Sequence, residues 1–287
     1  MVANVEIHPY ANVLGPALSA EDLFAIGRRA VAALQRHEVG GVVVTSGTGI
    51  IEEGCYASDL VNTSRKPIVW TGAMFSSDMW DTDGPRNLLN AVRVAASEET
   101  RGLGAVVCFN QEIHAARDVV KMHKTSLATF ASLDLGLLGR ADEDRVVVYR
   151  QPSLRRSFAA GRVETNVDLI QLAVGSDDRF FRASLAAGAR GIVVEGFPGP
   201  GIVCPGALPG VLAARRAAVP VVLATRALSG RTSPKYGGEI GAGDLIKHGV
   251  ILAGDLAPAK ARLLLMVLLG LTDDNSELTG LFADAAP

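Results

Sequence analysis

The sequence predicts an α/β protein of two domains, each a mainly parallel sheet flanked by helices. Short β-branched runs alternate with stretches that carry apolar residues at helical spacing, which is typical of βαβ units. The strand-like runs are continuously apolar, as in strands that are covered on both faces. A basic, irregular segment interrupts the alternation at residues 151–166. We therefore expect a first domain at residues 1–150, a linker at 151–166 and a second domain at 167–287.

The apolar runs and their flanking residues give the expected elements. Strands are expected at residues 41–45, 67–71, 105–109, 145–149, 168–174, 191–196 and 220–225. Helices are expected at residues 20–36, 87–96, 178–187, 205–216 and 258–271. Ser19 is a plausible N-cap with Asp22 at the third helical position. Asp83 could cap the next of these helices, with Pro85 in its first turn.

Composition narrows the class of protein. Hydrophobic residues make up 48% of the chain and charged residues 20%, so a large core can be buried and disorder is not expected. The formal net charge of -2 argues against a nucleic acid or an anionic membrane as partner. No secretion leader is recognisable, and the longest apolar run, residues 263–271, is too short to span a bilayer. The cysteines are widely spaced, which argues against a disulfide framework or a zinc site and favours the cytoplasm.

One turn stands out, in the stretch VVVTSGTGIIEEG at residues 42–54. It follows an expected strand and precedes a helix that starts near Ile50. Ligands of a parallel sheet bind beyond the carboxyl ends of its strands, and a helix start stabilises negative charge. The turn lacks a Walker sequence and a full GxGxxG. Two interpretations stay open: a site that uses Thr48 and nearby N–H groups, or hydroxyls of Ser46 and Thr48 that only cap the helix.

A second segment, NQEIHAARDVVKMHKTSLATF at residues 110–130, also follows an expected strand. Lys121 has apolar neighbours there. A lysine in a dry site loses proton affinity and can act as a base, and threonine activated by lysine is a known nucleophile arrangement. The alternative is a solvated surface lysine.

These segments resemble the bacterial-type L-asparaginase/glutaminase amidohydrolases. VVVTSGTGIIEE is similar to that family's second threonine motif, and the similarity continues through TGAMFSSDMWDTDGPRNLLNAV and RDVVKMHKTSLATF. In the second half it includes GIVVEGFPGPGIVCPGALPGVL, PVVLATRALSGRTSPKYGG and GVILAGDLAPAKARLLLMVLLG. The resemblance covers essentially the whole chain.

The resemblance implies two α/β domains, no metal, no organic cofactor, and a small-molecule substrate. It also implies homodimers or homotetramers with the active site between neighbouring chains. Thr48 matches the motif's catalytic threonine, and Lys121 matches the lysine that activates it. Backbone groups at Gly47 and Gly49 would lie against the substrate beside Ser46. Glu239 lies where a neighbouring chain's second domain is expected to reach the substrate.

Three departures from the family pattern bear on the substrate. The chain starts after the family's Thr-Gly-Gly-Thr strand and its mobile loop with a catalytic tyrosine. The motif aspartate, which holds the substrate's α-amino group, is Gly49 here, and the motif histidine is Ser46. The loop that grips the α-carboxylate is replaced by ANVLGPALS, which contains Leu14, Gly15 and Pro16.

The leading hypothesis is an asparaginase-like amidohydrolase that cleaves the C–N bond of a carboxamide, lactam or imide other than free L-asparagine. One alternative is a non-catalytic homologue that binds a small anion or has a regulatory role. Another is an ordinary asparaginase whose first segment is missing from the sequence or supplied by another polypeptide.

Overall fold

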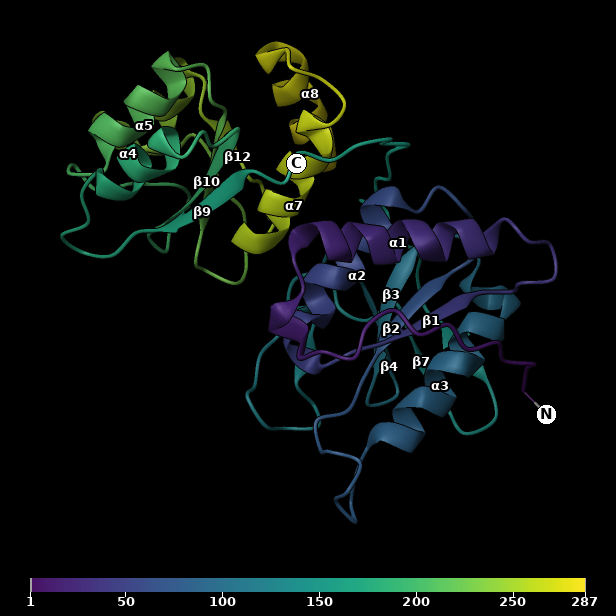
Figure 1. Cartoon of the computed structure of the whole chain (residues 1–287). Helices are drawn as coiled ribbons and strands as arrows, with labels where there is room; N and C mark the ends of the chain where they lie inside the picture. The colour runs from purple at the N-terminus through teal and green to yellow at the C-terminus, as the bar shows by residue number, and fades with distance from the viewer. Residues whose placement is uncertain (1, 287) are drawn as a thin grey trace. The chain divides into compact units, whose positions relative to one another are not determined.

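The computed structural model describes residues 2–286 and separates into two compact units, with the boundary between Ala159 and Ala160 (Figure 1). This boundary lies inside the segment 151–166, which contains no helix or strand. Each unit is a sheet flanked by helices, so the α/β fold class is confirmed.

The sheet of the first unit is mixed. Within the described residues it has six strands, which are, in order across the sheet, β1 (Val42–Thr45), β2 (Ile68–Thr71), β3 (Ala105–Phe109), β4 (Glu112–Ala115), β7 (Gly139–Ala141) and β8 (Val146–Val148). Strands β1 to β3 are parallel, whereas β4, β7 and β8 add antiparallel. The expectation of a mainly parallel sheet is therefore wrong for this unit.

A tight turn is the physical reason for that difference. Asn110 and Gln111 both have positive φ, 47° and 67°, between β3 and β4. Two residues with positive φ form the hairpin turn that matches strand twist, so the chain folds straight back instead of crossing over through a helix. The stretch after β3 is polar, so the sequence does not indicate the second strand of this hairpin.

Three long helices cover the two faces of the first sheet: α1 (Ala20–Leu34), α2 (Ile51–Val61) and α3 (Gly84–Ala96). Figure 1 shows α1 and α2 on one face and α3 on the other. The expected capping box is confirmed, because Ser19 Oγ accepts the N–H of Asp22 at 3.1 Å and the Asp22 carboxylate accepts the N–H of Ser19 at 2.8 Å. Short 3₁₀ turns are η1 (Gly15–Ala17), η2 (Thr48–Ile50) and η3 (Glu98–Thr100).

Asp83 occupies the N-cap position of α3, but its side chain makes no capping bond there. Its carboxylate instead accepts the N–H groups of Met74 and Phe75, at 2.9 and 3.0 Å. The expectation that Asp83 caps the helix is therefore wrong. The loop after β2 takes the carboxylate because its own N–H groups would otherwise lack acceptors.

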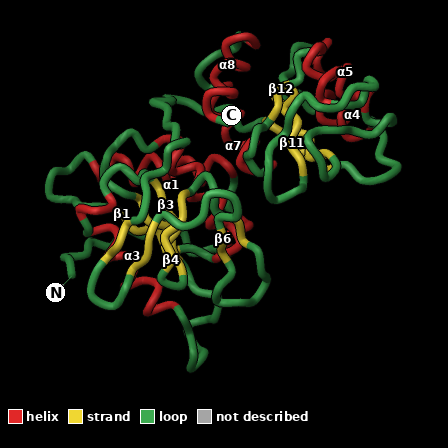
Figure 2. The backbone as a smooth tube through the Cα atoms, turned by 180° about the vertical axis from the view of Figure 1, so that it is seen from behind, coloured by secondary structure: helices red, strands yellow, loops and turns green. Residues whose placement is uncertain are grey.

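A small separate hairpin carries the lysine segment. It consists of β5 (Val120–Lys121) and β6 (Phe130–Ala131), which pair antiparallel outside the six-stranded sheet (Figure 2). Phe130 of β6 packs edge-to-face on Phe109 of β3, with ring centroids 5.1 Å apart. This contact places the hairpin near the carboxyl end of β3.

The second unit contains a fully parallel sheet, as expected. In the part of the chain that the structure describes, its four strands are, in order, β12 (Ile251–Leu252), β11 (Val221–Thr225), β10 (Gly191–Gly196) and β9 (Val167–Gln171). The helices of this unit are α4 (Arg179–Ala186), α5 (Leu208–Arg216), α6 (Ala242–Leu245), η4 (Ile246–His248), α7 (Pro258–Leu269) and α8 (Asn275–Ala285). None of the helices within residues 2–286 is long and apolar enough to span a membrane.

Candidate active site

The candidate site begins where β1 ends. The N–H of Ser46 donates to the carbonyl of Thr71 at 3.0 Å, which continues the pairing of β1 with β2 by one residue. The chain then turns through Gly47 into η2, whose first residue is Thr48. Helix α2 follows directly, so the first N–H groups of this helical stretch point toward the turn.

Lys121 and Thr48 are in direct contact. The Lys121 ammonium Nζ donates to Thr48 Oγ1 at 2.8 Å, and both residues are half-buried. They come from segments 73 positions apart, the turn after β1 and the β5–β6 hairpin. The fold thus brings together the two residues that the sequence nominates for chemistry.

The main chain of Lys121 is bonded to the same helical stretch that begins at Thr48. The N–H of Lys121 donates to Glu52 Oε2 at 2.8 Å, and Glu52 lies in the first turn of α2. The sequence alone does not indicate a role for Glu52 at the site. Its only signal was its place in an acidic pair at a helix start, where a role in favouring the helix dipole would already account for it.

The helix-capping interpretation of the turn fails. Among the described residues, neither η2 nor α2 has a side-chain capping hydrogen bond. Ser46 Oγ donates to the carbonyl of Gly47 at 3.3 Å, and Thr48 Oγ1 accepts from Lys121. The Thr48 hydroxyl is therefore directed to the lysine rather than to the helix backbone.

The glycines of the turn leave room beside Thr48. A Cβ added at Gly47 or Gly49 would meet no atom of the described residues within 4 Å, and both glycines are exposed. Gly15 opens η1 and lies against Ile50, whose Cγ1 would be 3.0 Å from a Cβ at that position. Packing against Ile50 is therefore tight at Gly15, whereas packing does not explain the missing side chain at Gly49.

Polar groups join the carboxyl ends of β2 and β3 behind the site. Asn87 Nδ2 donates to the carbonyl of Gly72 at 3.0 Å and to Asp83 Oδ2 at 2.8 Å. Asn87 Oδ1 accepts the N–H of Asn110 at 3.0 Å. Asn87 is buried, so these bonds fix the loops after both strands. Their place in the fold supports a structural role.

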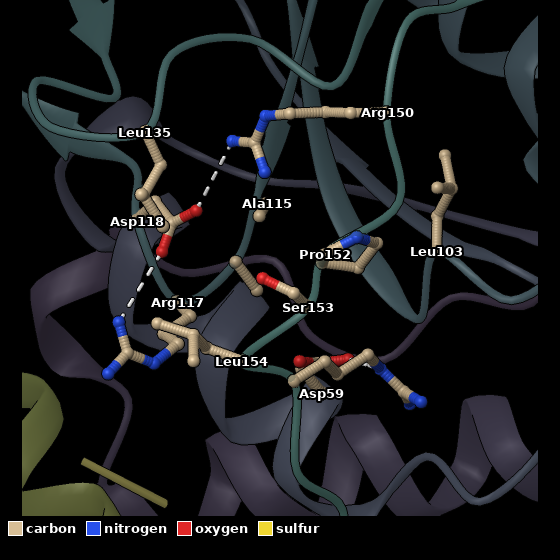
Figure 3. Close-up of a pocket in the computed structure, with 12 residues that line it drawn as sticks. Asp59, Leu103, Ala115, Arg117, Asp118, Leu135, Arg150, Pro152, Ser153 and Leu154 are labelled. Carbon is tan, nitrogen blue, oxygen red and sulfur yellow. Dashed lines mark hydrogen bonds and ion pairs between the residues drawn. The ribbon is translucent and has the colours of Figure 1, made fainter. Parts of the chain in front are cut away.

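An ionic cluster anchors the chain just before the lysine. Figure 3 shows Asp118 between the guanidinium groups of Arg117 and Arg150, each 3.6 Å from a carboxylate oxygen. The small hollow beside this cluster is also lined by Asp59, which pairs with Arg155 at 2.7 Å. Burial raises the pKa of the Asp59 carboxyl, and the charge of Arg155 opposes that rise. The cluster ties the residues preceding β5 to residues 150–155.

Glu239 belongs to the second unit. It has a positive φ of 63°, and its N–H donates to Asp244 Oδ2 at 3.1 Å. Its expected approach to a neighbouring chain's site stays a prediction. Within residues 2–286 no cluster of three metal-binding side chains occurs, and the absence of metal and cofactor also stays a prediction.

Comparison with known proteins decides the family. Residues 1–154 match the family model described as "Asparaginase, N-terminal", and residues 166–282 match the "Glutaminase/Asparaginase C-terminal domain". The chain belongs to the asparaginase family. The expected resemblance is confirmed, and with it an amidohydrolase class that acts on C–N bonds.

Individual relatives agree with that family. The chain is 33% identical to an L-asparaginase of Bacillus licheniformis over 92% of this chain and 82% of the relative. It is 32% identical to L-asparaginase 2 of Bacillus subtilis (strain 168) over 98% of this chain and 74% of the relative. It is 31% identical to the glutaminase-asparaginase of Pseudomonas fluorescens biotype A over 98% of this chain and 78% of the relative.

Proposed function

We propose that this asparaginase-family protein hydrolyses the C–N bond of a small carboxamide, lactam or imide other than free L-asparagine, through Thr48 and Lys121. The observation that supports it most is the 2.8 Å contact from Lys121 Nζ to Thr48 Oγ1 at the carboxyl end of β1. Sequence distance alone gave no reason for these two side chains to meet.

The pair supplies the groups that acyl transfer needs. A threonine hydroxyl is a weak nucleophile until a neighbouring base takes its proton. Lys121, once it has lost a proton, accepts the proton of Thr48 while the hydroxyl oxygen attacks the carbonyl carbon. Lys121 then returns the proton to the leaving nitrogen as the C–N bond breaks, and water hydrolyses the resulting ester. If Thr48 instead positions water, water replaces the hydroxyl as attacking group and no ester forms.

The start of the helical stretch supports the charged intermediate. The carbonyl oxygen becomes negative as the nucleophile adds. N–H groups near Gly47 and Gly49, at the positive end of η2 and α2, are suited to stabilise that oxygen. Removal of a single donor from such an oxyanion site typically costs about 100- to 1,000-fold in kcat.

Gly49 supports the substrate class. The turn offers no carboxylate at this position, although a side chain would fit there. Leaving a bound ammonium without a carboxylate partner costs on the order of 2–5 kcal/mol. An amide that lacks an α-ammonium group avoids that cost, so we infer a substrate of this kind.

L-Asparagine is the second candidate substrate. The relatives' names favour it, because the two Bacillus relatives are L-asparaginases and the Pseudomonas relative is a glutaminase-asparaginase. We also propose a cytoplasmic homodimer or homotetramer in which Glu239 of a neighbouring chain approaches the substrate.

An amide panel tests the proposal. The purified protein is offered asparagine, glutamine, succinamate, succinimide and simple lactams, with release of ammonia or ring opening as readout. Thr48→Ala and Lys121→Ala are measured in parallel. We expect one of the amides without an ammonium group to turn over fastest and both variants to lose that activity. Unchanged turnover in either variant would refute the site, and a preference for asparagine would refute the substrate class.

Inertness toward every amide would favour the non-catalytic alternative. In that case a small dicarboxylate such as succinate should raise the melting temperature of the protein, and Lys121→Ala should abolish the increase.

A further inference from the structure

We propose that Glu52 is a positioning residue that holds the main chain of Lys121 so that its ammonium group reaches Thr48. The inference rests on the proposed function of the Thr48–Lys121 pair. It assigns a task to a carboxylate that touches neither the reacting hydroxyl nor the expected substrate.

Two hydrogen bonds join Lys121 to the helical stretch that contains Thr48. Lys121 N donates to Glu52 Oε2 at 2.8 Å, and Lys121 Nζ donates to Thr48 Oγ1 at 2.8 Å. Thr48 and Glu52 are four residues apart on the consecutive helical segments η2 and α2. Both ends of Lys121, its backbone and its side-chain tip, are therefore fixed to one short stretch of chain.

The lysine segment needs such a tether because its own secondary structure is slight. Strand β5 has two residues and pairs only with β6 in the described structure, in a hairpin separate from the six-stranded sheet. The residues that follow Lys121, 122–125, are exposed. A two-residue strand contributes few ladder bonds, and the ionic cluster at Asp118 holds the chain three residues earlier. The bond to Glu52 therefore restrains the main chain of Lys121 directly.

The chemistry of the tether suits this task. A hydrogen bond from a backbone N–H to a carboxylate is stronger than one to a neutral acceptor. The carboxylate itself is held on α2, where the positive helix start favours it, and Glu52 is half-buried. Misplacement of a catalytic group by about 1 Å can cost about 100-fold in rate.

Three variants test the inference. Glu52→Ala removes the acceptor, Glu52→Gln keeps an oxygen that can accept the N–H, and Glu21→Gln, at an exposed position in the first turn of α1, is the control for the same change of charge. We expect Glu52→Ala to lower kcat by about 10- to 100-fold with KM nearly unchanged, because positioning is lost while binding is kept. We expect Glu52→Gln to stay within about threefold of the unaltered protein, because its amide oxygen still accepts the N–H, although more weakly than a carboxylate. We expect the same of Glu21→Gln, because Glu21 is exposed and lies outside the site.

A structural readout accompanies the kinetics. Hydrogen exchange of the Lys121 amide, followed in the peptide that contains residues 119–123, should speed up in Glu52→Ala and stay slow in Glu52→Gln. This measurement applies whether or not the variant is active. If Glu52→Ala does not fold, Glu52→Asp, which retracts the acceptor by one methylene, should show an intermediate loss of kcat and faster exchange.

Two outcomes would overturn the inference: full kcat with slow exchange in Glu52→Ala, or equal losses in Glu52→Ala and Glu52→Gln, which would assign the effect to charge. Thr48→Ala is measured beside them. Full activity in Thr48→Ala would instead refute the proposed function, whatever the Glu52 variants do.

Discussion

At the scale of single residues, the site depends on contacts that no local pattern contains. Thr48 and Lys121 meet across 73 positions and Lys121 and Glu52 across 69. The residue types and the family resemblance nominated Thr48 and Lys121 for chemistry. Glu52 could not be nominated, because an acidic residue in the first turn of a helix is common for reasons unrelated to any partner.

Gly49→Asp tests the reason for the substrate class at a single position. The space around Gly49 is open, so we expect the variant to fold normally and to place a carboxylate beside the site. The ratio of kcat/KM for asparagine to that for succinamate should rise about 30-fold, which corresponds to about 2 kcal/mol, the lower end for a charge pair because Gly49 is exposed.

Gly49→Asn is the matched control for this change, since it has the same shape without the charge. It should leave the ratio within about threefold of the unaltered protein, because neutral hydrogen bonds at exposed positions contribute little. An equal rise in both variants, or no rise in the aspartate variant, would contradict the explanation.

At the scale of elements, the sequence predicted what periodicity and caps can encode. The runs at residues 105–109 and 191–196 form strands with the expected bounds, and the capping box at Ser19 starts α1 where expected. Strand β4 and the β5–β6 hairpin were missed, because they are short and their formation depends on the turn at Asn110 and on packing against Phe109. Helix α8 was also missed, although Asp274 caps it.

The packing of α2 against β2 can be tested by a substitution at Gly54. A Cβ at Gly54 would lie 2.3 Å from Cη2 of Trp70, which is fully buried in β2. Gly54→Ala should therefore destabilise the protein by about 1–3 kcal/mol, the usual cost of overpacking a core. Urea unfolding at equilibrium measures the change, through the midpoint at constant slope.

Gly49→Ala is the control for the helix start, because the same added methyl group meets no described atom within 4 Å. It should change the free energy of unfolding by less than about 0.5 kcal/mol. Equal effects of the two alanine substitutions would show that α2 does not rest on Trp70 as described.

At the scale of the whole molecule, two sheets with helices on their faces bury the many hydrophobic residues of the sequence. The fold class and the family follow from features spread along the entire chain, which is why they could be predicted. The mixed pairing of the first sheet could not be predicted, because either a hairpin or a crossover can follow the same apolar run.

The cysteines report on the integrity of the whole fold. Burial raises the pKa of the Cys108 thiol to about 12, and Cys55 is also buried, whereas Cys204 is half-buried. A raised pKa keeps Cys108 in its unreactive thiol form as pH rises from 7 to 9. We expect a thiol reagent to modify Cys204 first in the native protein and all three cysteines after unfolding. Rapid modification of Cys108 in the native protein at pH 9 would contradict this burial.

Thr48 and Lys121 should act as one catalytic unit, and a double-mutant cycle on turnover of the preferred amide tests this directly. Thr48→Ala and Lys121→Ala should each lower kcat/KM by about 100- to 10,000-fold, the range expected when proton transfer is lost. The kcat/KM of the double variant should be no more than about threefold below that of the less active single variant, because the effects of residues in one catalytic unit are not additive. Losses that multiply in the double variant, or full activity in either single variant, would show that Thr48 and Lys121 do not act as one catalytic unit.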